Sequence, residues 1–279
     1  MRNYFCGWYY RCQSDSHTLA IIPSIHETKD GVLYKIQVIT GSGAFHASFR
    51  HGDLHKNRHT LSIDDSRFDH SGISLDIRTP QLQASGNLRF GTFSPIAYDI
   101  MGPFRYVPFL QCRHSVFSMK HTVDGALTFN DTCYCFENAV GYLEGDRGGS
   151  FPKAYAWTQC FFPEGSLMLS VADVPLGGIH ITGIIGIIML GGKEYRLATY
   201  LGAKVVKIGD GELTIRQGTL VFTARRLDKP GHPLQAPIRG AMGRTIYENP
   251  SCRAFYHLKE NGFTLLELDA DNAAFEYEY

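Results

Sequence analysis

The chain has 279 residues, which is enough for one large or two medium-sized domains with a sizeable buried core. Hydrophobic residues make up 44% of the sequence and charged residues 19%, a composition typical of globular proteins and not of disordered ones. Lysine plus arginine and aspartate plus glutamate both number 27, so the formal net charge is +0. A neutral chain gives no electrostatic reason to expect binding to nucleic acid or to an anionic membrane surface.

The pattern of the seven cysteines predicts reduced thiols and no zinc site. Their number is odd, no Cys-x-x-Cys occurs, and Cys133-x-Cys135 has no second pair to complete a zinc site. The N-terminal segment MRNYFCGWYYR lacks the apolar region of a signal peptide. The most apolar run, Leu176–Leu190, is too short and too rich in glycine for a membrane span. We therefore expect a cytoplasmic protein with reduced thiols, no transmembrane segment, no metal and no cofactor.

Short apolar or alternating runs predict β-strands throughout the first half. Tyr4–Cys12 carries aromatic residues at both parities, which indicates a strand buried on both sides. Val116–Val123 and Ala126–Phe129 are predicted to form a hairpin around Asp124-Gly125, a favoured turn pair. Further strands are predicted at Leu19–Ile25, Val32–Thr40, Ala44–Arg50, Ile73–Ile77 and Leu82–Phe90.

The second half repeats this pattern, with predicted hairpins at Asp210-Gly211 and Asn261-Gly262. No segment has a sustained helical stripe with caps, so the sequence predicts an all-β, antiparallel fold. About fifteen or more strands exceed one small barrel, which favours two packed β domains over one. A boundary within the polar stretch NDTCYCFENAVG would divide the chain almost evenly.

One stretch, Gly141–Phe161, combines charge and aromatic residues in an ordered way. Glu144 and Asp146 are two residues apart, so an extended chain places both on one face, and Arg147 follows directly. After a Gly-Gly-Ser turn the chain alternates: one face is predicted to carry Tyr155, Trp157, Gln159 and Phe161, and the other Ala154, Ala156, Thr158 and Cys160. Small residues allow close packing against another layer, which leaves the aromatic face to line a cavity.

Four segments keep their order along the chain: FCGWYYR at Phe5–Arg11, MGPFRYVPFLQCRHSVFSMKH at Met101–His121, GYLEGDRGGSFPKAYAWTQC at Gly141–Cys160 and APIRGAMGRTIYE at Ala236–Glu248. Together they resemble the tocopherol cyclase family over most of the chain, and E-x-D-x-G-x-S-F-P-x-x-Y-x-W-x-Q is the most specific pattern. The sequence departs from the family at Arg147, where tryptophan is usual. The resemblance implies two lipocalin-like antiparallel β-barrel domains packed together, residues 1–135 and 136–279, related to carotenoid hydratase-type proteins.

The resemblance also implies acid catalysis without a redox cofactor, since plant members close a chromanol ring on a prenylated hydroquinone. An acid protonates an alkene, a tertiary carbocation forms, and the phenol oxygen attacks it. Burial favours the neutral form of a carboxyl group, and two close carboxylates do not readily both ionise. We therefore predict Asp146 as the proton donor and Glu144 as its partner. One of the two acids would pair with Arg147 or Arg244.

The remaining candidate residues would bind a hydrophobic small-molecule substrate. The predicted set comprises Trp8, Tyr9, Tyr155 and Trp157 as cation-facing aromatics, Gln159 to orient the phenol oxygen, and Arg147, Arg244 and Glu248. Three other interpretations stay open. The protein can be a non-catalytic carrier of a hydrophobic ligand, or a hydratase or isomerase that uses the same cation. The acids and aromatics can also be ordinary ion pairs and core. His26, His114 and His121 are interpreted as structural.

Overall fold

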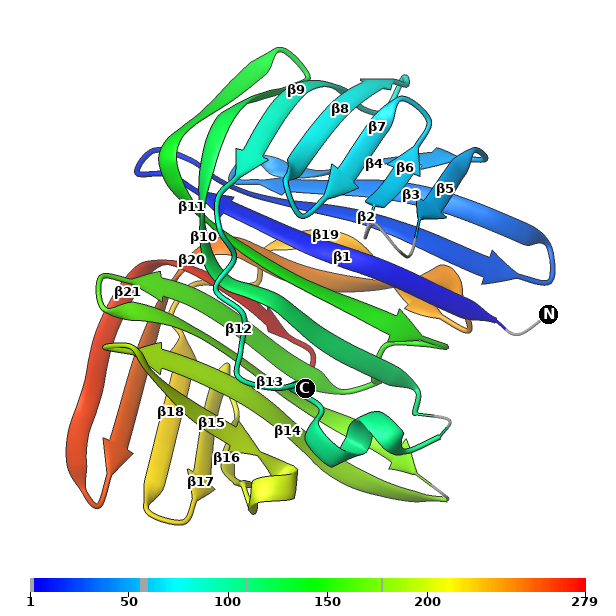
Figure 1. The fold of residues 1–279 in the computed structure, drawn as a ribbon. Coiled ribbons are helices and arrows are strands. Elements are labelled where there is room, and N and C mark those ends of the chain that lie inside the picture. Colours follow the sequence, from blue (N-terminus) through cyan, green and yellow to red (C-terminus); the bar gives the residue numbers. More distant parts are fainter. Residues whose placement is uncertain (1–2, 56–59, 109, 177) are drawn as a thin grey trace. The chain divides into compact units, whose positions relative to one another are not determined.

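A computed structural model describes residues 3–55, 60–108, 110–176 and 178–279. The described chain is all-β, as the sequence predicts, with two short 3₁₀ helices, η2 (Gly102–Tyr106) and η3 (Thr199–Leu201), and no α-helix in those ranges (Figure 1). Neither of the described helices is long or apolar enough to cross a membrane.

The first sheet has 11 antiparallel strands in the order β4-β3-β2-β1-β11-β10-β9-β8-β7-β6-β5. Strand β1 therefore joins the N-terminal meander to the later hairpin β10–β11. The strands are β1 (Tyr4–Gln13), β2 (Thr18–Thr28), β3 (Gly31–Thr40), β4 (Gly43–Phe49), β5 (Gly52–His55), β6 (Thr60–Ile63), β7 (Ser66–Asp69), β8 (Gly72–Arg78), β9 (Gln83–Phe90), β10 (Cys112–Phe129) and β11 (Thr132–Gly148).

The second sheet has 10 strands, nine in the order β15-β14-β13-β12-β21-β20-β18-β17-β16, with β19 paired to β20. Here β12 joins the meander β13–β15 to the last hairpin β20–β21. The strands are β12 (Tyr155–Phe162), β13 (Gly165–Leu176), β14 (Ile179–Leu190), β15 (Lys193–Ala198), β16 (Lys204–Gly209), β17 (Glu212–Gln217), β18 (Leu220–Arg226), β19 (His232–Ile238), β20 (Ala241–Glu260) and β21 (Phe263–Tyr277).

The chain separates into two compact units. The first contains Met1–Pro95, Val116–Ser150 and Pro237–Arg244. The second contains Ile96–Ser115, Phe151–Ala236 and Thr245–Tyr279. The boundary proposed from the sequence, between residues 135 and 136, lies inside β11.

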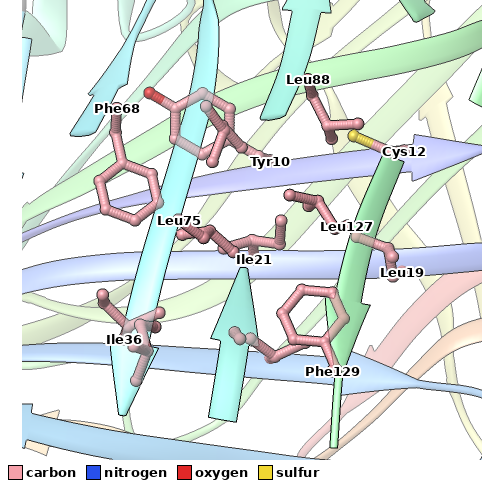
Figure 2. Packing of buried hydrophobic residues seen from close by; sticks show 14 of the residues in the cluster. Tyr10, Cys12, Leu19, Ile21, Ile36, Phe68, Leu75, Leu88, Leu127 and Phe129 are labelled. Atoms are coloured by element: carbon pink, nitrogen blue, oxygen red, sulfur yellow. The ribbon is translucent and has the colours of Figure 1, made fainter. Parts of the chain in front are cut away.

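Each unit has its own apolar core, enclosed by a curved sheet. In the first unit, Tyr10, Ile21 and Ile36 on the N-terminal strands pack in one cluster with residues from the β6–β11 side, among them Phe68 and Leu127 (Figure 2). The ring centroids of Tyr10 and Phe68 are 6.1 Å apart. These side chains alternate with residues of the opposite face, as expected for strands that bury one face in a core.

The core of the second unit contains the small face of the β12 stretch. Ala156 and Cys160 belong to this cluster, together with Phe222 and Tyr256, whose rings stack with centroids 6.2 Å apart. The Thr158 hydroxyl, on the same small face, lies 2.5 Å from the Tyr256 hydroxyl and donates to a backbone carbonyl at 2.8 Å. The predicted division of this stretch into a small face and an aromatic face is therefore confirmed.

Two of the predicted turns are confirmed. Asp210-Gly211 joins β16 to β17, and Asn261-Gly262 joins β20 to β21. All four residues have positive φ, between 53° and 85°, as the primed turns of tight hairpins require.

The predicted hairpin at Asp124-Gly125 is wrong, because β10 runs through it without interruption. Gly125 has φ +126°, and a Cβ there would lie 2.2 Å from the carbonyl oxygen of Asn87 on β9. The glycine thus permits close approach of two backbones within the sheet. The chain turns instead at Asn130 and Asp131, with φ 43° and 70°.

Ile21→Ala tests the first core. The Ile21 side chain is fully buried, so its truncation leaves a cavity and should lower the free energy of unfolding by about 2–5 kcal/mol. Val32→Ala, at an exposed position on β3, should lower the free energy of unfolding by less than about 0.5 kcal/mol. Guanidinium unfolding followed by circular dichroism measures both; equal effects would contradict the assignment of Ile21 to a closed core.

Candidate functional site

The candidate residues fall into two groups, one in each unit. The first unit holds Trp8, Tyr9, Glu144, Asp146, Arg147 and Arg244. The second unit holds Tyr155, Trp157, Gln159 and Glu248.

The pairing of β1 with β11 decides which residues of the first group share a face. Tyr9 lies directly opposite Glu144, and Gly7 lies directly opposite Asp146. Opposed residues of an antiparallel pair project to the same side, so both acids and Tyr9 occupy one face. We call this the polar face of the first sheet. The uninterrupted register from Phe5 to Gln13 keeps this alternation intact.

Two predicted residues lie on the other side of these strands. Trp8 is partly buried and packs against the apolar core of the first unit. Arg147 is exposed and lies opposite Cys6, on the face away from Glu144 and Asp146. Arg244, half-buried, lies in the first part of β20. The alternation of β11 thus sets Arg147 apart from the acids it follows in the sequence.

A tyrosine holds Glu144 in place. The Tyr142 hydroxyl donates to Oε2 of Glu144 at 2.5 Å, and both side chains are buried. Burial, together with the adjacent Glu144 carboxylate, raises the pKa of Tyr142 well above its usual value, so the hydroxyl stays protonated and acts as a donor. Tyr142 is not among the residues predicted from the sequence, although its position two residues before Glu144 places it on the same face of the strand.

Arg11 is a second residue that the sequence analysis missed. It lies directly opposite Tyr142, on the polar face, and its side chain is fully buried. In the register it is diagonally adjacent to Glu144. Arg11 could have been identified as a candidate because it is a charged residue within the aromatic segment FCGWYYR. Buried arginines are rare and occur where an anionic or polar group is bound.

Ser24 and His26 on β2 extend the polar face. Nδ1 of His26 lies 3.0 Å from the carbonyl oxygen of Gly240, and Nε2 lies 2.8 Å from the Ser24 hydroxyl. A carbonyl oxygen only accepts, so Nδ1 carries the proton and Nε2 accepts from Ser24. Burial lowers the pKa of His26 to about 4, and burial also lowers the pKa of the neighbouring Lys35 to about 8.

The second group occupies the aromatic face of β12, outside the core of the second unit. Tyr155, Trp157 and Gln159 alternate along this face and are all buried. Trp157 lies opposite Glu276 on β21, and Glu276 lies opposite Glu248 on β20. Two buried glutamates thus lie beside the aromatic row. Glu276 is not among the residues predicted from the sequence, although the alternating run Phe275-Glu276-Tyr277 is typical of a strand.

Tyr155 is fixed by one of these glutamates. Its hydroxyl donates to Oε2 of Glu276, so the ring is held at the edge of the aromatic row. The ring centroids of Phe151 and Tyr155 lie 6.0 Å apart in an edge-to-face arrangement. The aromatic face is therefore a fixed surface with polar groups at defined positions.

Glu144 and Asp146 on β11 are also potential metal ligands. Carboxylate oxygens suit a divalent metal ion, but the same groups also serve proton transfer. The sequence analysis treated His114 as structural and predicted no metal.

Comparison with known proteins identifies the fold. No protein-family model and no curated protein matches the chain. Among solved structures, CghA is similar at TM-score 0.61 and 10% identity, covering 99% of this chain and 88% of that one. CghA with Sch210972 gives 0.60, with the same identity and coverage. Kievitone hydratase from Nectria haematococca gives 0.58 at 10% identity, covering 98% and 88%. At this identity the similarity establishes the all-β, lipocalin-like fold.

The buried histidine predicts a pH-dependent stability. Folding lowers the pKa of His26 from 6.5 to about 4, so between these values the unfolded chain binds a proton that the folded chain does not. The stabilisation is complete above pH 6.5 and is lost as the pH falls toward 4. At pH 5 the free energy of unfolding should be about 2 kcal/mol lower than at pH 7.5 through this residue.

Urea unfolding of the protein and of His26→Gln at both pH values measures this effect. The variant should lose that part of the pH dependence. A residual slope should persist, because burial also lowers the pKa of His121 to about 4. An unchanged slope in His26→Gln would show that His26 does not stay neutral in the folded protein.

Proposed function

We propose that this protein is a cofactor-free, tocopherol cyclase-like enzyme that cyclises or hydrates an alkene in a hydrophobic small molecule, such as a prenylated phenol. One observation carries the proposal. Glu144 and Asp146 share a face of β11, and the Tyr142 hydroxyl is hydrogen-bonded to Glu144. The two acids thus differ in their surroundings: Glu144 accepts the Tyr142 hydrogen bond, and we assign the proton-donor role to Asp146.

In the proposed reaction, Asp146 is the proton donor. Its carboxyl group gives a proton to the alkene carbon, which leaves a tertiary carbocation on the substrate and a carboxylate on the protein. A phenol oxygen or a water molecule then forms a bond to the cation and releases its own proton to that carboxylate. Atoms and charge balance without any redox step. Gly7, which has no side chain, lies directly opposite the donor in the register.

Aromatic side chains would stabilise the cation. Tyr9 lies opposite Glu144 on the polar face, and an aromatic ring stabilises a nearby cation by about 0.5–2 kcal/mol. Tyr155 and Trp157, with Gln159 and Glu248, remain proposed substrate contacts because they form a buried aromatic and polar face outside the core. Burying polar groups costs free energy unless they are hydrogen-bonded, so a buried polar face calls for a functional reason.

The fold supports an alkene substrate. One protein of this fold carries the name kievitone hydratase, and a hydratase adds water to a carbon–carbon double bond. Hydration and ring closure share the protonation step and differ only in which oxygen attacks the cation. This similarity favours catalysis over ligand carriage as the role of the buried acids.

Asp146→Asn should abolish turnover and leave ligand binding nearly unchanged. The amide keeps the shape and hydrogen-bonding capacity of the side chain but has no transferable acid proton. The matched control is Glu137→Gln, an exposed acid on the same strand, which should keep full activity. Product formation from prenylated quinols, measured by chromatography, tests both variants. Full activity in Asp146→Asn would transfer the donor role to Glu144 or Glu248.

Trp157→Leu should weaken both binding and turnover, because one aromatic wall would support substrate and cation alike. The rate should fall more than the affinity, since a cation gains more from the ring than a neutral alkene does. Steady-state kinetics and equilibrium binding separate the two effects. Unchanged kinetics would remove Trp157 from the substrate contacts.

Deuterium incorporation distinguishes an enzyme from a carrier. Incubation with prenylated quinols and other apolar alkenes in deuterated water should leave one deuterium at the protonated carbon of the product. Mass spectrometry detects it. Tight binding across the panel with no product and no deuterium would favour a non-catalytic carrier of a hydrophobic ligand.

A further inference from the structure

Two exposed thiols stand side by side near the start of β11. The Sγ atoms of Cys133 and Cys135 lie 3.6 Å apart. Tyr134 and Phe136 point to the opposite side of the strand and belong to the apolar core of the first unit. The two-residue period of the strand therefore holds both thiols together on its exposed side.

The backbone beneath these thiols is fixed. The tight turn at Asn130 and Asp131 precedes them, with both residues at positive φ. The Asn130 amide donates to the carbonyl of Gln83 at 3.0 Å, and the Gln83 amide donates to Oδ1 of Asn130 at 3.0 Å. With the turn tied to β9, and the strand anchored in the core by Tyr134 and Phe136, the dithiol is preorganised.

The distance between the sulfurs suits a chelate better than a disulfide. Thiolate sulfur binds zinc at about 2.3 Å, so two sulfurs of a tetrahedral site lie about 3.8 Å apart. The observed 3.6 Å is close to that separation. A disulfide requires about 2.05 Å, which would pull the side chains together along a strand that keeps alternate residues apart.

Two thiolates at this separation repel each other. A divalent ion bound to both sulfurs removes that repulsion, so the pair favours a cation.

Among the residues that the structure describes, no group of three or more close His, Cys, Asp or Glu ligands includes Cys133 or Cys135, so two donors are found at this position. The remaining coordination positions would be filled by solvent, which makes the site open and the ion exchangeable.

We propose that Cys133 and Cys135 form a bidentate dithiolate site for a thiophilic divalent metal ion of the zinc and cadmium class. On binding, two thiols release two protons to solvent, and two metal–sulfur bonds replace two metal–water bonds. No electrons are transferred. The missing second cysteine pair excludes a closed structural zinc site but not this open one. The proposal does not depend on the proposed function.

Titration of the full, reduced protein with cadmium tests the site. Ultraviolet absorbance from cadmium–thiolate bonds should rise to one tight equivalent per chain. Cys133→Ser and Cys135→Ser should each weaken binding at least tenfold, because one thiolate cannot chelate. Cys112→Ser, at a partly buried cysteine, is the matched control and should bind as the unaltered protein does. Circular dichroism checks that each variant is folded.

Thiol counting and pH give independent readouts. Bound cadmium should protect two thiols from a disulfide reagent, and the affinity should fall as the pH is lowered, since two protons compete with the metal. Failure of the reduced protein to bind cadmium would overturn the proposal. So would unchanged binding in both Cys133→Ser and Cys135→Ser, or a loss of binding in Cys112→Ser alone.

Discussion

The antiparallel pairing of β1 with β11 is the constraint on which the first unit depends. In the observed register Tyr10 lies opposite Leu143, and both belong to the apolar core. Tyr9 lies opposite Glu144, and both face the other way. A slip of one residue would exchange the two faces, burying the acid in the core and exposing the apolar side chains. The same pairing therefore provides the stability of the core and the geometry of the candidate site.

A polar face that is buried must satisfy its own hydrogen-bonding groups. Tyr142 donates to Glu144, and His26 is bonded at both ring nitrogens. In the second unit Tyr155 likewise donates to Glu276. Loss of hydration costs a buried polar group about 1–3 kcal/mol unless a partner replaces water. Each unit therefore carries a polar face on which a tyrosine hydroxyl is paired with a buried carboxylate.

The sequence predicts the strand content and the face assignment of β12 because both depend on local alternation. Predictions from local patterns fail where a residue is determined by its contact with a distant segment of the chain. Asp124-Gly125 is typical of a turn, but it lies within a strand. A side chain at Gly125 would collide with the carbonyl oxygen of Asn87 on the neighbouring strand, so the position needs a glycine. Glu276 meets Trp157 only through the pairing of β12 with β21. Arg147 follows the acids in sequence but lies on the other face, because alternation outweighs adjacency.

Gly7 connects the sequence motif FCGWYYR to the candidate site. It lies between Asp146 on β11 and Ser24 on β2, directly opposite each in the register. A Cβ at this position would approach the Cβ of Ser24 to 3.3 Å, which is tighter than ordinary side-chain contact. Any larger residue would press on Ser24. Gly7 therefore permits the close approach of β1 and β2 at this point, and its backbone conformation does not by itself require a glycine, since its φ is not in the left-handed region.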